Sequence, residues 1–269
     1  MYLCKALQVQ TEFILKKMKF NKKSIGHLAI FTSSFIFGIY LPLSKTILSV
    51  YIDAQTLTVF RFCGAALLFW IASLFIKKEP VPFKDLLLMF GASLFGVVIN
   101  QFAFLEGLSK SSVIDTGIIQ TTTPIITMLL AALFLKEPIT GRKVLGVLVG
   151  LSGALLLVFA NGFKSDESSS LIGILLLISS AFTFALYLTL FRSLIVRYSP
   201  ITLMKWLFLF AAIIGISIYG KRITEFDFVN MPSMVYFKIA YVVVAATFIT
   251  YLLIPIAQKK VAPNYDQYV

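Results

Sequence analysis

Eight long runs of predominantly apolar residues alternate with short polar segments along the 269-residue chain. Each run approaches the roughly 20 residues that a helix needs to cross the hydrocarbon core of a bilayer. Backbone N–H and C=O groups find no water in that core, so spanning segments of this length must be α-helices. The pattern therefore predicts an all-α integral membrane protein with spans at 27–48, 57–76, 86–105, 113–135, 144–160, 172–195, 201–219 and 235–256.

The composition supports this fold class. Hydrophobic residues make up 59% of the chain and charged residues 13%, whereas soluble domains contain about 45–50% apolar and about 25% charged residues. One soluble core cannot cover so much apolar surface, but lipid solvates it. His27, the single histidine, has no neighbour at metal-ligand spacing, and no nucleotide-binding motif is present. We therefore expect no metal and no cofactor.

The positive charge of the chain, +12 net, indicates its orientation. Most of the 24 Lys and Arg residues lie in the N-terminal segment and in alternate loops, a bias that marks cytoplasmic segments. Residues 1–23 are thus expected to form a basic cytoplasmic segment of a multi-pass protein in the cell (inner) membrane. Basic residues that bind nucleic acid cluster on one face instead. The expected partners are the lipid bilayer and a small-molecule substrate, not nucleic acid.

The first and sixth apolar runs resemble each other. Without gaps, segments 25–48 and 172–195 are identical at nine of 24 positions, including Tyr40 and its equivalent Tyr187. The runs that follow keep nearly the same offset, with Thr56 against Thr202. A repeat unit of five spans is odd in number, so its second copy enters the membrane from the opposite side. This predicts an inverted-topology repeat, the architecture of many secondary transporters.

Four segments resemble the EamA-type permeases of the drug/metabolite transporter superfamily. They are FGIYLPLSK (37–45), FRFCGAALLFW (60–70), NQFAFLEGLS (100–109) and TTTPIITMLLAALFLKEPITGRKVLGVLVGLSGALLL (121–157). The last is the most specific, because it joins a mid-span proline, an apolar half-helix, a KEPIT turn and a Gly-rich fifth span. The resemblance covers about residues 24–263. It implies ten helices in two five-helix repeats and transport of small metabolites.

The chain departs from that pattern at its C-terminus. The repeat offset aligns residues 259–263 with the start of the fourth span, but the following NYDQYV is polar. We therefore expect eight of the usual ten transmembrane helices. The first repeat is expected at 24–160, an incomplete second repeat of three helices at 171–263, and an atypical tail at 264–269. On this interpretation the chain is a truncated or frame-shifted member of the family.

Polar residues inside the spans are candidates for a substrate-binding site, because polar groups are costly at membrane depth. Asn100 and Gln101 lie well inside the third span. One interpretation is that they hydrogen-bond a substrate in a central cavity. The other is that they bond neighbouring helices, a contact worth only about 0.6–2 kcal/mol.

A second candidate group lies near the middle of the fourth span and comprises Gln120, Thr121, Thr122 and Pro124. Proline removes one helical hydrogen bond, and the carbonyl freed near Gln120 is predicted to face substrate together with the threonine hydroxyls. Transporters of other folds bind substrate at such broken helices. The alternative is a simple kink in which the threonine hydroxyls bond their own backbone.

Tyr40, Tyr187 and Arg61 complete the predicted substrate-binding residues. Tyrosines at equivalent places in inverted halves either gate the path from opposite sides or serve as anchors and packing. Arg61 lies about one turn inside the outer end of the second span. It either pairs with an anionic group of the substrate, or orients the helix by snorkelling and pairs with a loop carboxylate such as Asp53.

Two features receive mainly structural interpretations. Glu137 is expected to pair with Arg142 or Lys143 at the cytoplasmic surface. Gly146 and Gly150 form a GxxxG pattern that lets helices approach closely, either within the chain or in a homo-oligomer.

The predicted function is secondary transport, with export of small metabolites such as amino acids by alternating access. The alternative is a truncated, non-transporting membrane protein of the same family. A membrane-embedded enzyme would need clustered acidic residues, histidines or metal ligands near one interface. The spans hold no such cluster, so we do not expect an enzyme.

Overall fold

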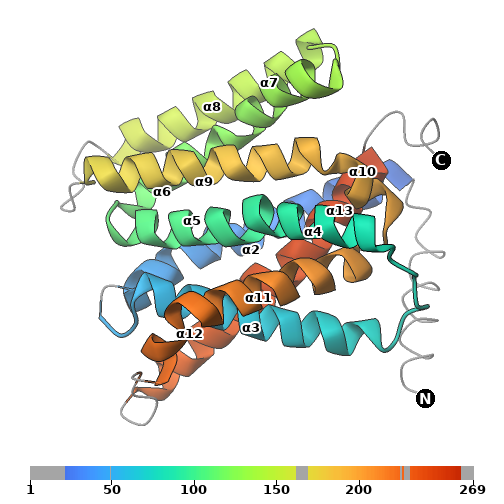
Figure 1. The fold of residues 1–269 in the computed structure, drawn as a ribbon. Helices are drawn as coiled ribbons and strands as arrows, with labels where there is room; N and C mark the ends of the chain where they lie inside the picture. Colours follow the sequence, from blue (N-terminus) through green and yellow to red (C-terminus); the bar gives the residue numbers. More distant parts are fainter. Residues whose placement is uncertain (1–21, 49, 162–168, 225, 227–230, 262–269) are drawn as a thin grey trace.

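The computed structural model describes residues 22–48, 50–161, 169–224, 226 and 231–261, which form helices and short connections with no strand among them (Figure 1). This confirms the predicted all-α fold. The predicted basic segment lies almost wholly outside the described residues, and the predicted tail at 264–269 lies outside them entirely.

Helices cover all eight predicted spans. Seven of the helical segments in the described ranges are long and apolar enough to cross a membrane, and the helix over 144–160 is not among these seven. The elements are α2 (Lys22–Leu48), α3 (Ala54–Ser73), α4 (Phe83–Ser93), η1 (Leu94–Ile99), α5 (Asn100–Ser109), α6 (Val113–Thr121), α7 (Thr123–Leu135), α8 (Gly141–Asn161), α9 (Leu171–Leu190), α10 (Arg192–Arg197), α11 (Pro200–Thr224), α12 (Ser233–Val243), η2 (Val244–Ile249) and α13 (Thr250–Val261).

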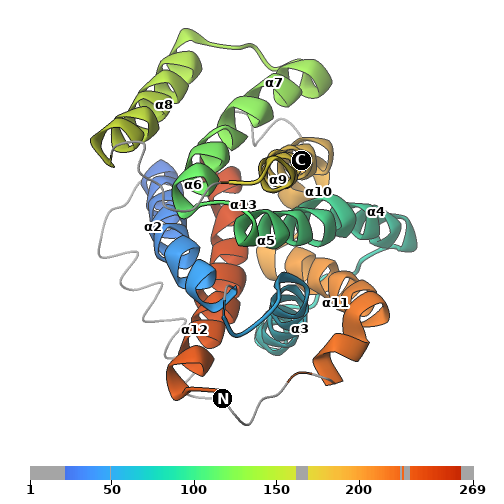
Figure 2. The ribbon, with the colours of Figure 1, turned by 90° about the vertical axis from the view of Figure 1, so that its left-hand side faces the viewer.

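Helices from the two predicted repeats interleave in one bundle. Helix α11 packs along α3, α13 packs along α2, and α9 packs along α5 and α7. Figure 2 shows α13 between α2 and α11, while α7 and α8 stand at the edge of the bundle. The arrangement places residues from distant parts of the chain side by side at the centre, with Phe62 and Phe208 among the fully buried side chains.

The third and eighth spans share the same irregularity. In each, eleven α-helical residues lead into a six-residue π-helix, α4 into η1 and α12 into η2. Single π-helical turns inside α-helices are rare and are frequent at functional sites. The two spans begin at Phe83 and Ser233, an offset close to that between Tyr40 and Tyr187. A matched irregularity is what an inverted five-helix repeat would produce, and the repeat itself stays a prediction.

The GxxxG residues of α8 have open surroundings. A Cβ added to Gly146 or Gly150 would meet no atom within 4 Å in the part of the chain that the structure describes, and α8 packs mainly against α6. The predicted close approach of these glycines to another helix is therefore not seen within the described part of the chain. A homo-oligomer contact stays a prediction.

A substitution at Gly96 tests the close packing between η1 and α9. A Cβ added there would lie 2.5 Å from Cγ of the Tyr187 ring, which is 1% exposed. We expect Gly96→Ala to lower the free energy of unfolding by about 1–3 kcal/mol, because the added methyl overpacks the core. The measurement is the apparent Tm of purified protein in detergent.

The matched control is Gly38→Ala in α2, where an added Cβ meets no atom within 4 Å. Its Tm should stay at or above the wild-type value, because alanine is the better helix former. Equal Tm values for the two variants would contradict the packing described for η1 and α9.

Candidate functional site

A buried arginine lies at the centre of the bundle. Arg61 of α3 is 3% exposed. Its Nε donates to Oγ1 of Thr247 in η2 at 2.8 Å, and its Nη1 donates to the hydroxyl of Tyr40 in α2 at 2.5 Å. The guanidinium carbon also lies 5.0 Å from the centroid of the Tyr40 ring, within the range of a cation–π contact. One side chain thus joins three spans drawn from both predicted repeats.

The π-helix η2 presents Thr247 to this arginine. The Thr247 hydroxyl donates to the carbonyl of Val242, five residues earlier, at 2.7 Å, so its oxygen remains oriented to accept from Arg61. The predicted alternative partner, Asp53, is used elsewhere. It caps α3 by accepting from the backbone N–H of Thr56 at 2.7 Å and lies 3.9 Å from Arg222. Arg61 forms no ion pair with any described residue.

Asn100 and Gln101 lie immediately after the other π-helix, η1, and behave differently. The Asn100 amide donates to the carbonyl and hydroxyl of Ser180 in α9, each at 2.9 Å, and its oxygen lies 3.3 Å from the Tyr251 hydroxyl. This geometry matches the interhelical interpretation. The Gln101 amide is 1% exposed, and neither of its polar atoms forms a hydrogen bond with the described residues.

Tyr251 of α13 connects these groups. Its hydroxyl lies 3.1 Å from the carbonyl of Gly96. The Tyr251 side chain also lies next to the Gln101 amide and within electrostatic range of the Arg61 guanidinium. Tyr187 of α9 is 1% exposed and lies within electrostatic range of Tyr251, but its hydroxyl has no hydrogen-bond partner in the described ranges. We call the set that shares these contacts the central cluster. It comprises Tyr40, Arg61, Asn100, Gln101, Tyr187, Thr247 and Tyr251.

Sequence reasoning did not single out Thr247 and Tyr251. Threonine and tyrosine are ordinary in apolar helices, so neither residue stands out by type. The offset between α4 and α12 supplies a signal, because it sets Tyr251 opposite Gln101. A search for polar residues at equivalent places in the third and eighth spans would have found this pair.

The predicted group in the fourth span lies outside the central cluster. Helix α6 ends at Thr121 and α7 begins at Thr123, so the span is interrupted there, with Pro124 in the first turn of α7. The hydroxyls of Thr121 and Thr122 donate to carbonyls three residues earlier, each at 2.6 Å. These bonds match the simple-kink alternative. Gln120 keeps a buried Nε2 without a partner in the described structure, and a substrate role for the group stays a prediction.

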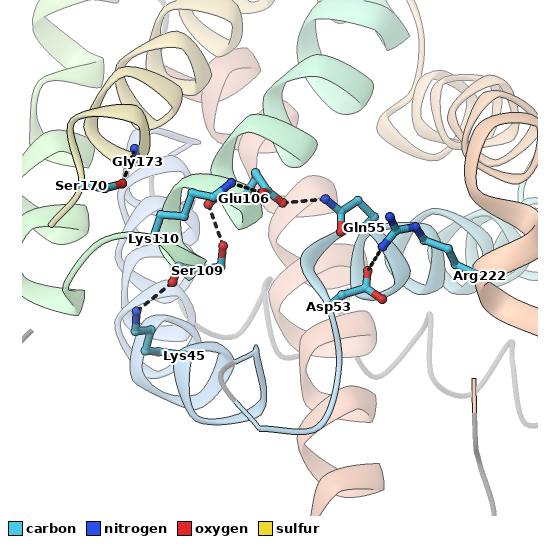
Figure 3. Close-up of polar contacts among 9 residues, drawn as sticks. All are labelled: Lys45, Asp53, Gln55, Glu106, Ser109, Lys110, Ser170, Gly173 and Arg222. Atoms are coloured by element: carbon cyan, nitrogen blue, oxygen red, sulfur yellow. Dashed lines mark hydrogen bonds and ion pairs between the residues drawn. The ribbon is translucent and has the colours of Figure 1, made fainter. Parts of the chain in front are cut away.

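Polar contacts close the bundle at the end where α2 finishes, which we call the opposite face (Figure 3). Lys45 of α2 donates to carbonyls at and just beyond the end of α5, including that of Ser111 at 2.9 Å. A cation in this position is stabilised by the negative C-terminal end of the helix dipole. Glu106 of α5 accepts from Nε2 of Gln55 at 2.8 Å and pairs with Lys110. These contacts link α2, α3 and α5 at the opposite face.

A different set of contacts closes the end where α2 begins, the N-terminal face. Asp85 of α4 accepts from Nη1 of Arg197 at 2.7 Å and from the Tyr198 hydroxyl. Glu79 accepts from the backbone N–H of Ser199 at 3.0 Å. A cavity of about 430 Å³ opens beside this contact. Its lining includes Leu252 of α13, the residue next to Tyr251.

Glu137 pairs as expected with Lys143, at 3.2 Å, and also with Arg192 of α10. Burial opposes ionisation of this carboxyl, but the hydrogen bonds from Arg192 and Lys143 outweigh burial and hold the pKa of Glu137 below its usual value. In the described ranges, no three His, Cys, Asp or Glu side chains gather as metal ligands would.

Apolar helices around a buried polar cluster define the chain as a multi-pass membrane protein. A profile of the EamA-like transporter family matches residues 24–159, about half of the 269-residue chain. The chain belongs to the EamA-like transporter family, which confirms the resemblance seen in the sequence.

Similar proteins are named as transporters. An uncharacterized transporter of Archaeoglobus fulgidus is 33% identical over 144 residues, which cover 53% of this chain and 49% of that protein. The uncharacterized transporter YetK of Bacillus subtilis is 24% identical over 201 residues, covering 71% of this chain and 60% of YetK. The chain thus spans about half to three-fifths of the length of these relatives. The family and these relatives are named for membrane transport, not for an enzymatic activity.

A solved crystal structure shares the fold. It superimposes with a TM-score of 0.63 at 19% identity, covering 89% of this chain and 79% of the other. At this level of identity the likeness shows the helical architecture alone.

The pH dependence of stability tests the contacts of Glu79 at the N-terminal face. Burial opposes its ionisation, but hydrogen bonds from Thr202 and Ser199 outweigh burial and lower the pKa of the Glu79 carboxyl. A carboxyl with a lowered folded-state pKa stabilises the fold above its unfolded pKa, about 4.3. That stability is lost as the pH falls through the folded value.

We therefore expect the Tm of the wild-type protein to drop on acidification from about pH 5 to about pH 3, and Glu79→Gln to flatten part of that drop. Tm in detergent across this range is the measurement. Ser217→Ala, an exposed hydroxyl of α11, serves as the control and should follow the wild-type profile. Parallel profiles for the wild type and Glu79→Gln would contradict the role given to this carboxylate.

Proposed function

We propose that the protein is a secondary transporter that exports small metabolites such as amino acids by alternating access. The observation that carries this proposal is the central cluster itself. Polar and charged groups at membrane depth are costly and mark substrate paths in membrane proteins. Here Arg61 and Gln101 lie on helices of the first predicted repeat, and Thr247 and Tyr251 lie on helices of the second. A solute bound between them would contact both halves.

The closing contacts at the two faces support alternating access. Each face is held by a few hydrogen bonds and ion pairs between helices, such as Gln55 with Glu106 on one side and Asp85 with Arg197 on the other. Partly exposed ion pairs contribute only about 0–1 kcal/mol each. Opening one face therefore costs little, and a bound solute can shift the population between states that differ by a few kcal/mol.

The proposed orientation places the N-terminal face on the cytoplasmic side of the inner membrane. Lys77 lies in the connection before α4, Lys84 and Arg142 lie in the first turns of α4 and α8, and Lys260 lies near the end of α13. Basic residues in short loops are retained on the cytoplasmic side. With this orientation, the cavity beside Glu79 opens toward the cytoplasm, the side from which an exporter takes up its solute.

A substitution at Gln101 distinguishes a role of this side chain in solute binding from a role in packing. Gln101→Leu removes two buried polar atoms that have no hydrogen-bond partner in the described structure, so it should leave the free energy of unfolding unchanged or raise it. If the amide contacts the solute, flux should fall about tenfold, since a lost hydrogen bond worth about 1.4 kcal/mol changes affinity by that factor.

The measurements are solute flux in proteoliposomes across a metabolite panel and Tm in detergent. Ser217→Ala is the control and should keep both values. Unchanged flux together with a lowered Tm would assign Gln101 to packing and count against the proposal.

The alternative is that this chain does not transport. The open surroundings of α8, which packs mainly against α6, favour this alternative. Solute flux through the chain in proteoliposomes is the measurement. Saturable flux supports the proposal, and no flux above that of empty liposomes across the metabolite panel supports the alternative.

A further inference from the structure

We propose that the central cluster selects small solutes with a single carboxylate and binds that carboxylate on Arg61. This inference rests on the proposed transport function and names the substrate class of the same site. Two observations carry it: a buried positive charge that no described residue neutralises, and buried hydrogen-bonding groups beside it that have no partner.

The charge of Arg61 is uncompensated within the described structure. Both of its acceptors, Tyr40 and Thr247, are neutral hydroxyls, and arginine keeps its charge in proteins. Other cations in the spans are placed differently. Lys45 reaches backbone carbonyls at a helix end, and Lys205 lies 5.2 Å from the Trp70 ring. A lone buried charge is strongly unfavourable unless a counter-ion arrives, so Arg61 requires an anion that the described chain does not supply.

The geometry favours a carboxylate over a phosphate. Tyr40 and Thr247 hold the guanidinium plane through Nη1 and Nε, which leaves further N–H donors of the same fork for a ligand. A guanidinium fork matches a carboxylate through two parallel hydrogen bonds. A phosphate monoester carries about −1.5 to −2 charges, more than the single positive charge of Arg61 can balance. One charge on the protein therefore corresponds to one carboxylate on the solute.

The neighbouring unpartnered groups extend the site beyond the carboxylate. The Gln101 amide and the Tyr187 hydroxyl are each 1% exposed and have no hydrogen-bond partner in the described structure. Tyr251 lies next to Gln101 and within electrostatic range of both Arg61 and Tyr187, so these groups belong to one neighbourhood. An amide both donates and accepts, which suits an α-amino or α-hydroxyl group next to the carboxylate. The substrate class is therefore amino acids and hydroxy acids that carry one carboxylate.

The charge of the site comes from the first predicted repeat alone. The offset between Thr56 and Thr202 places Leu207 at the position equivalent to Arg61. Leu207 is fully buried and apolar. The site is therefore electrostatically one-sided, so a solute binds with its carboxylate toward α3.

The first experiment compares matched solutes on the wild-type protein. Amino acids and hydroxy acids are paired with their uncharged-carboxyl forms, the amides, and with phosphate monoesters of similar size. Ligands that bind the folded state raise Tm, and at equal concentration the ligand of higher affinity raises it more. We expect carboxylates to raise Tm in detergent, and to be carried in proteoliposomes, with about tenfold or greater preference over the amides and over the phosphate esters.

The second experiment uses charge variants. Arg61→Gln should remove the preference for the carboxylate, and Arg61→Lys should keep part of it, because lysine retains the charge but not the fork. Lys205→Gln is the matched control, since it also removes a cation from a span, and it should keep the wild-type preference.

The outcomes distinguish the inference from the proposed function. Equal stabilisation and flux for carboxylates and amides in the wild type would overturn the anion inference and leave transport intact. Preference for phosphate esters would overturn the carboxylate assignment. If Arg61→Gln lowers stabilisation and flux equally for a carboxylate and its amide, Arg61 has a structural role and does not bind the carboxylate. Absence of flux with carboxylate stabilisation retained would support the inference and count against transport by this chain.

Discussion

The contact of Arg61 with Tyr40 and Thr247 is the interaction on which the rest of the structure depends. A charged group placed among apolar helices needs polar neighbours that stay in position, because no bulk water reaches it. The two hydroxyls come from α2 and η2, so satisfying this one guanidinium requires three spans to meet at a defined height. The interleaving of α2, α3 and the eighth span then follows from the same requirement.

The π-helices make this meeting possible. A π-helical turn alters the direction in which the following side chains point. In η2 the hydroxyl of Thr247 bonds a carbonyl five residues earlier and still accepts from Arg61. In η1 the close approach of Gly96 to the Tyr187 ring brings α9 against the third span, and Asn100 then reaches Ser180. Each π-helix thus lies next to polar groups of the central cluster, while regular helix elsewhere presents apolar side chains to lipid.

The sequence predicted many residues of the site, but not the contacts between them. Polar residues in apolar runs are conspicuous, so Asn100, Gln101 and Arg61 could be selected by type and depth. Their partners could not. Asn100 bonds another helix while Gln101 does not, although the two are adjacent in sequence, because successive helical residues point about 100° apart and only packing decides which one meets Ser180. Likewise, Asp53 looked like a partner for Arg61, but the start of α3 uses it as a cap.

Hydrophobic length and the absence of water in a bilayer were enough to determine the all-α membrane fold, the helix positions and the interruption at Pro124, because each depends on local composition and backbone hydrogen bonding. The family resemblance was also carried by local motifs. Only the tertiary structure decided that Thr247 and Tyr251 join Arg61 and Gln101. These contacts connect residues more than a hundred positions apart, and such pairings depend on helix packing rather than on any single segment. The buried charge was visible in the sequence, and its lack of a counter-ion among the described residues emerged only when the helices were assembled.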